Sequence, residues 1–141
     1  MIKTYQSDIL DICRTYNAND AKFIDSSSII TAHWTRFKCR YGCPGYDHSL
    51  CCPPHTPDAD ETRKIISEYH AGLLVHFSGD VPVTKSIVNI EREIFLKNFH
   101  KVISFGAGPC RLCTDCDKTR CKFPKEARPS MEGCGIDVYT T

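Results

Sequence analysis

The amino-acid sequence predicts a small α/β (or α+β) domain in which helices pack on a mostly parallel sheet. The main observation is that segments with helical periodicity alternate with short segments rich in β-branched residues. Two successive strand-to-helix passages of this kind predict at least one right-handed parallel crossover. Two cysteine-rich segments of irregular composition each follow a predicted strand, which is a common place for binding sites in such folds.

The N-terminal half begins with a predicted helix, because apolar residues recur at steps of three and four along one face. These residues are Ile2, Tyr5, Ile9, Ile12 and Tyr16. The polar segment 17–20 ends this helix, and the β-branched segment 23–34 predicts a strand. Segment 39–54 contains two glycines, three prolines and four cysteines, so we expect an irregular loop there.

The second half opens with a helix start at Thr56 and Pro57. Proline suits the first helical position, and the acidic residues that follow suit the positive end of the helix dipole. The predicted elements are a helix that ends near Tyr69, a buried strand over 72–77, a helix over 83–98 and a strand over 102–105. Glycines at positions 106 and 108 then lead into the second group of cysteines.

The chain of 141 residues is predicted to form a single domain, 1–141, since it can bury a core and shows no linker composition. A net charge of +1 gives no reason to expect nucleic acid or an anionic membrane as a partner. The first twenty residues lack the apolar stretch of a signal peptide, and no apolar run is long enough to span a membrane. We therefore expect a cytoplasmic location.

Cysteine is the unusual part of the composition, with ten residues in the chain. Cytoplasmic thiols stay reduced, so clustered cysteines there indicate metal ligands rather than disulfides. Four of them fall within twelve residues: Cys110, Cys113, Cys116 and Cys121. Three cysteines at a constant step match the C-x2-C-x2-C run that holds iron–sulfur clusters. Zinc is the competing metal, although its four-thiolate sites usually draw on two separated cysteine pairs.

A second candidate ligand set lies in segment 39–54 and consists of Cys39, Cys43 and Cys52. Two of these cysteines precede a proline, which stiffens the turn that presents the ligand. Adjacent cysteines rarely bind one cluster together, so Cys51 is expected to be a packed thiol. The fourth ligand of this set stays open between Cys134, Cys51, Cys121 and an iron without a protein ligand.

The residues around the second group of cysteines carry an excess of positive charge. Segment 111–128 contains six basic and three acidic residues. These cations would offset the negative charge of a cluster with four thiolates, although a solvated basic face is the alternative. His48 and His55 lie in or beside the first group of cysteines, and we expect them, like the other histidines, to be surface or partly buried residues rather than ligands.

These observations favour an iron–sulfur protein with one or two [4Fe-4S] clusters that handles electrons for a partner enzyme in anaerobic metabolism. The sequence shows no nucleophile–base set and no substrate motif. Whether the protein is itself an enzyme stays open, because an iron without a protein ligand at the Cys39, Cys43 and Cys52 set would be a catalytic position. A third reading is a zinc-stabilised binding module, in which the metal only folds the loops.

Several ordered segments of the chain resemble a prokaryotic family of cysteine-rich, predicted metal-binding proteins, the domain of unknown function 2284. The segments that carry the resemblance are Lys38–Tyr46, Cys52–Pro54, Thr56–Tyr69, Ile90–Leu96, Gly106–Cys113, Ala127–Glu132 and Gly135–Val138. The resemblance extends from about Thr31 to the C-terminus. It implies metal binding, with iron and sulfide, through Cys39, Cys43, Cys52, Cys110, Cys113, Cys116 and Cys121.

The same resemblance bears on Cys134 as a ligand and on the length of the C-terminal segment. Relatives are less uniform at Cys134, which weakens this residue as a ligand. They also run on for some tens of residues after Gly135–Val138, so we expect either a short member of the family or a truncated chain, with an exposed sheet edge or a partner in that place.

Overall fold

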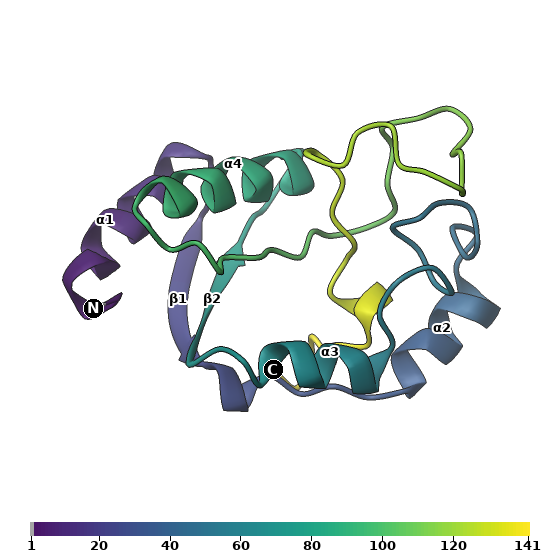
Figure 1. Cartoon of the computed structure of the whole chain (residues 1–141), viewed down its shortest axis with the longest axis horizontal. Coiled ribbons are helices and arrows are strands. Elements are labelled where there is room, and N and C mark those ends of the chain that lie inside the picture. Colours follow the sequence, from purple (N-terminus) through teal and green to yellow (C-terminus); the bar gives the residue numbers. More distant parts are fainter. Residues whose placement is uncertain (1) are drawn as a thin grey trace.

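The structure is a computed structural model, and it describes residues 2–141. Its elements are α1 Ile2–Thr15, β1 Asp20–Asp25, η1 Ser26–Ser28, α2 Trp34–Gly42, α3 Ala59–Ile66, β2 Ala71–His76, α4 Val83–Leu96 and η2 Glu132–Cys134. Figure 1 shows α1 and the two strands at one end of the molecule and the irregular cysteine-containing segments at the other. Within the described residues, no helix has the length and apolar character needed to cross a membrane.

The sheet consists of two antiparallel strands, so the predicted mostly parallel sheet is wrong and the fold is a small α+β fold. In β1 and β2, Asp20 faces His76 and Asp25 faces Ala71. Segment 102–105, which was expected to supply a further strand, forms no ladder, and only Gly106 after it makes an isolated bridge, to Ser130. Without that strand there is no parallel crossover.

The strand expected over 23–34 ends early because Asp25 turns the chain. Its carboxylate accepts hydrogen bonds from the backbone N–H of Ser27 at 2.8 Å and from the Ser27 hydroxyl at 2.7 Å. Such side-chain contacts compete with a sheet ladder and favour a turn. The three residues that follow therefore form η1.

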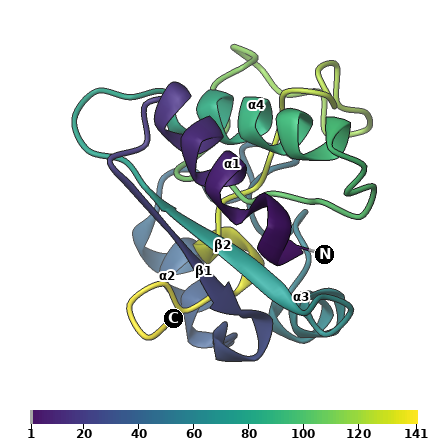
Figure 2. The ribbon, with the colours of Figure 1, turned by 90° about the vertical axis from the view of Figure 1, so that its left-hand side faces the viewer.

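The apolar core lies where α1 packs on β1 and α4, as Figure 2 shows from the side of α1. Ile9 and Cys13 of α1 and Ile90 of α4 are buried there. Tyr5 packs edge-on against Phe99, with ring centroids 5.5 Å apart. The helices predicted near the N-terminus and over 83–98 are confirmed as α1 and α4, because the apolar face of each packs on this core.

The first group of cysteines begins on a helix, where the sequence predicted only a loop. Cys39 lies within α2, and the irregular chain starts at Cys43. The Thr35 hydroxyl donates to the carbonyl of Ala32 at 3.1 Å near the start of this helix. Thr35 is the only buried residue of α2, so the apolar residues at positions 34, 37 and 41 do not pack into a core.

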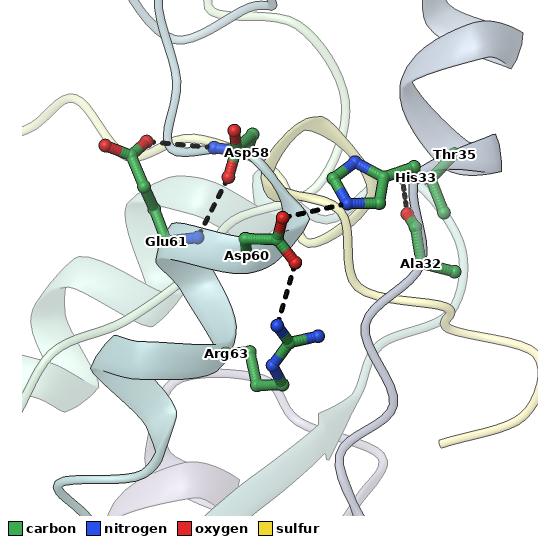
Figure 3. A network of polar contacts seen from close by, with 7 residues as sticks. All are labelled: Ala32, His33, Thr35, Asp58, Asp60, Glu61 and Arg63. Atoms are coloured by element: carbon green, nitrogen blue, oxygen red, sulfur yellow. Dashed lines mark hydrogen bonds and ion pairs between the residues drawn. The ribbon is translucent and has the colours of Figure 1, made fainter.

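The starts of α2 and α3 are tied together by a polar network, shown in Figure 3. Asp58 caps α3 through a capping box with Glu61, so the helix begins at Ala59, after the predicted Pro57. Asp60 lies 3.2 Å from His33 and 2.8 Å from Arg63. The stretch from His33 to Asp60, which contains the first group of cysteines, is therefore closed at its two ends by this contact.

The C-terminal segment packs against both helices and completes the frame of this end. The Ala32 N–H donates to the Gly135 carbonyl and the Asp137 N–H donates to the Ile30 carbonyl, each at 2.8 Å. Gly135 has φ +84°, and a Cβ built on it would lie 2.7 Å from the Cα of Ala59. Only glycine permits this close approach at this backbone conformation.

Candidate metal centre

The two cysteine-rich segments lie against each other at the end of the molecule opposite α1 (Figure 1). We call residues 39–54 the first cysteine segment and residues 106–121 the second. A Cβ built on Gly45 would lie 3.4 Å from the Cβ of Pro109, so the backbones approach closely. Asp47 pairs with His55 at 2.7 Å and with Lys118 of the second segment at 3.5 Å.

A cavity of about 150 Å³ lies between the two segments, and cysteines form much of its wall. Its lining includes Cys51, Cys52, Cys110, Cys113, Cys116 and Cys121. The four cysteines that the C-x2-C-x2-C run predicted to act together therefore do lie around one space. His48, Arg120 and Lys122 also line it. All ten cysteines of the chain are free thiols.

Two members of the second predicted set, Cys43 and Cys52, lie together around Gly45 of the first segment. The sulfur atoms of Cys43 and Cys52 lie 3.5 and 3.8 Å from the point where a Cβ of Gly45 would be. The Gly45 N–H donates to the Cys43 sulfur at 3.4 Å, which is a contact that stabilises a thiolate. Burial raises the pKa of Cys39, and the negative charges of Cys43 and Cys52 raise it further, as does that of Glu132.

Cys51 lies beside the cysteines of the second segment, whereas the adjacent Cys52 lies beside Cys43. Cys51 is buried, as expected for a packed thiol, but its neighbours are other cysteines. Burial raises the pKa of Cys51 to about 12, and Cys110 adds to this through its charge and a hydrogen bond. Cys121 acts in the same direction. The sequence signal for this placement is the Cys51–Cys52 pair itself, which allows two adjacent thiols to point to different places.

Cys134 is fully buried beside η2, and the structure does not bring it into either group. Burial raises its pKa to about 12, and the only charge that acts on the thiol is that of Arg36, which lowers the pKa. Arg36 itself donates to the carbonyl of Thr56 at 2.9 Å. Of the three cysteines weighed as the fourth ligand of the first set, Cys134 therefore has the least support from its surroundings.

Within residues 2–141, no three histidine, cysteine, aspartate or glutamate side chains are arranged to hold one metal ion. The cysteine thiols line a cavity of about 150 Å³ instead, which is the space available for a metal centre.

The positive charges predicted around the second segment divide into two kinds. Arg120 and Lys122 line the cavity itself. Arg128 forms a two-armed ion pair with Glu91 of α4, at 2.8 and 3.0 Å, and the charge of Cys51 raises the Arg128 pKa further. Hydrogen bonding to Glu91 is the main cause of that raised pKa. Arg128 thus connects the chain that follows the second segment to α4.

A larger cavity, of about 660 Å³, lies elsewhere, between the end of β1 and α3. Its walls include serine, isoleucine and threonine side chains together with Asp25, Arg63, Tyr69 and His70. No cysteine lines this cavity. The cysteine cavity is therefore the better candidate site, although it is the smaller of the two.

Comparison with known proteins agrees with the chemistry of this site. No curated protein and no solved structure matches the chain. A family model described as "Predicted metal-binding protein (DUF2284)" matches residues 22–141. This range contains both cysteine segments and Cys134, and it leaves out only α1 and the start of β1. The chain therefore belongs to this family of predicted metal-binding proteins, which confirms the resemblance found in the sequence.

Proposed function

We propose that this protein binds an iron–sulfur cluster of the [4Fe-4S] type and carries electrons for a partner enzyme. The observation that carries the proposal is the common cavity of Cys110, Cys113, Cys116 and Cys121. Thiolates at this spacing are the ligands that hold such clusters in small redox proteins. When bound, the cluster would supply the one-electron chemistry, and the chain would supply its thiolates and its surroundings.

The surroundings of the cavity support a charged centre. A cluster with four thiolates is an anion, and Arg120 and Lys122 would offset part of its charge. The four cysteines of the second segment are half-buried, so the cluster would lie close to the protein surface. Electron transfer to a partner requires such a short distance. We propose that the protein serves anaerobic metabolism in the cytoplasm, where an oxygen-sensitive cluster is protected.

A second cluster is proposed at the group formed by Cys39, Cys43 and Cys52. The Gly45 N–H already donates to the Cys43 sulfur, and hydrogen bonds to sulfur are one means by which a protein sets the potential of a cluster. The two groups share one wall, since Cys52 also lines the cavity of the second segment. One chain would then hold two centres close together.

The test of this function is a redox measurement on protein purified without oxygen. Reduction with dithionite should produce an electron paramagnetic resonance (EPR) signal, and stepwise oxidation should remove it at a defined potential. A protein that contains iron but gives no reversible signal between reducing and oxidising conditions would overturn the electron-transfer role. A colourless protein that unfolds on chelation would favour the zinc-stabilised binding module instead.

One observation favours an enzyme as the second candidate function. The first set has three cysteines, and Cys134 does not lie with them. An iron without a protein ligand is the position at which a small substrate would bind. Addition of a small anionic ligand such as cyanide should then change the EPR signal of the first centre, while the signal of the second centre stays the same. An unchanged spectrum would remove this candidate.

A further inference from the structure

Cys51 and Cys52 are adjacent in sequence but belong to different groups of thiols. Cys52 lies near Cys43, with both sulfur atoms around Gly45. Cys51 lies within the influence of Cys110 and Cys121 of the second segment. Both side chains are 8 % exposed, so neither thiol is presented to solvent as a surface residue.

The backbone around Cys51 is fixed by its own hydrogen bonds. The Cys51 N–H donates to the Ser49 hydroxyl at 3.2 Å, and the Cys52 N–H donates to the Ser49 carbonyl at 3.1 Å. Ser49 is buried. These hydrogen bonds fix the backbone of the turn that carries the two thiols. Metal ligands commonly receive such support from hydrogen bonds outside the ligand set.

The chemistry of the neighbourhood argues against a purely structural thiol. A packed cysteine normally lies among apolar side chains, as the buried Cys13 of α1 does in the apolar core. Cys51 instead shares the wall of a cavity with five other cysteines. Thiols crowded in this way repel one another once ionised, and a cation shared among them removes that repulsion.

We propose that Cys51 is a ligand of the centre held by the second segment. This inference rests on the proposed function. It makes a ligand of a cysteine that the sequence predicted to be a packed thiol. Five thiols would then be available for four positions, from Cys51, Cys110, Cys113, Cys116 and Cys121. Cys51 takes one of these positions, and the four cysteines of the second segment share the other three.

The first test is substitution with matched controls. Iron, acid-labile sulfide and the EPR spectrum are measured for Cys51→Ala, Cys113→Ala, Cys43→Ala and Cys13→Ala. Cys51→Ala should lose iron and sulfide and should remove the same EPR component as Cys113→Ala. Cys43→Ala should affect the other component, and Cys13→Ala should keep the full iron content. A Cys51→Ala protein with the iron, sulfide and spectrum of the unchanged protein overturns the inference.

A second test uses the unchanged chain and does not depend on the folding of a variant. Cysteine alkylation is mapped by mass spectrometry before and after iron is removed with a chelator under anaerobic conditions. Cys51 should become reactive together with Cys110 and Cys121, whereas Cys13 should stay unreactive in both forms. A Cys51 thiol that stays as protected as Cys13 after iron removal contradicts the inference.

The two failures are distinguishable. If the unchanged protein contains no iron or sulfide, the proposed function itself is wrong. If it contains both and Cys51 behaves as Cys13 does, the function stands and only the assignment of Cys51 is wrong. Cys51→Ser adds a further reading, because an oxygen ligand in place of sulfur should shift the EPR spectrum rather than abolish it.

Discussion

The thiol of Cys51 lies beside that of Cys110, although the two residues come from different segments of the chain. This contact makes the two cysteine segments parts of one site. The apolar core lies at the other end of the molecule, around Ile9 and Ile90. At the site end, turns and ion pairs such as Asp47–His55 order the cysteine segments, and Ala59, Cys134 and Ile136 are buried behind them.

Metal removal is predicted to loosen the two cysteine segments and to leave the core intact. Segments 43–56 and 106–127 contain no sheet ladder, whereas α1, α4 and the two strands have their own packing. Amide hydrogen exchange of the metal-loaded and metal-free protein should therefore differ mainly in those two segments. A uniform increase in exchange along the whole chain would mean that the metal holds the entire fold together.

The stability of the metal-free protein is predicted to fall as the pH rises above 9. Burial raises the pKa of Cys134 from 9.0 to about 12, so the folded thiol keeps its proton while the unfolded thiol loses it. The unfolded state then binds fewer protons, and stability declines between these two values by up to about 1.4 kcal/mol per pH unit. Denaturant unfolding at a series of pH values measures this slope.

The control for that experiment is Cys134→Ala, which removes the titrating group. Its free energy of unfolding will be lower at every pH because a buried side chain is shortened. Its decline above pH 9 should nevertheless be shallower than that of the unchanged chain. Equal slopes for the two proteins would show that Cys134 has an ordinary pKa in the folded state.

Gly135 is predicted to tolerate no side chain. Gly135→Ala adds a clash with Ala59 to the cost of a positive φ, whereas Gly79→Ala adds only the latter, since Gly79 has φ +75° and open space around it. Gly79→Ala should cost about 1–2 kcal/mol. Gly135→Ala should exceed this by about 1–3 kcal/mol, because the start of α3 must shift. Thermal unfolding of both variants tests the difference, and equal losses would contradict it.

The Glu91–Arg128 pair is predicted to hold α4 to the chain that follows the second cysteine segment. Burial opposes ionisation of Glu91, but hydrogen bonds from Arg128 and Ser104 outweigh it and lower its pKa. Glu91→Gln should lower the free energy of unfolding by about 1–3 kcal/mol, because the part-buried Arg128 loses its charged partner. Lys85→Ala, an exposed change on the same helix, should have little effect. A loss of similar size in both variants would argue against a specific role of the pair.

The helices were predictable from the sequence where they have an apolar face to bury. Apolar residues recur with helical periodicity in α1 and α4, including the buried Ile9 and Ile90, and both helices form where expected. The helix α2 was missed although Trp34, Phe37 and Tyr41 recur at helical spacing, and these side chains are exposed rather than packed on the core. The parallel sheet was wrong for a related reason: an extended apolar segment such as 102–105 predicts a strand, but its sequence does not show whether a partner strand is available.

The candidate site was predictable as far as local spacing determines it. Four cysteines within twelve residues, Cys110 to Cys121, can come together in one compact loop, and they line one cavity. The position of Cys51 depends on how the two segments meet, which is a tertiary contact that no spacing encodes. The same limit applies to Cys134, whose neighbours depend on the path of the C-terminal segment.

The most direct test of the account is a count of iron, zinc and acid-labile sulfide per chain in protein purified without oxygen. The account predicts a brown protein with iron and sulfide in equal amounts and little zinc. One zinc per chain with no sulfide would contradict it, because the thiols would then hold a single ion rather than a cluster.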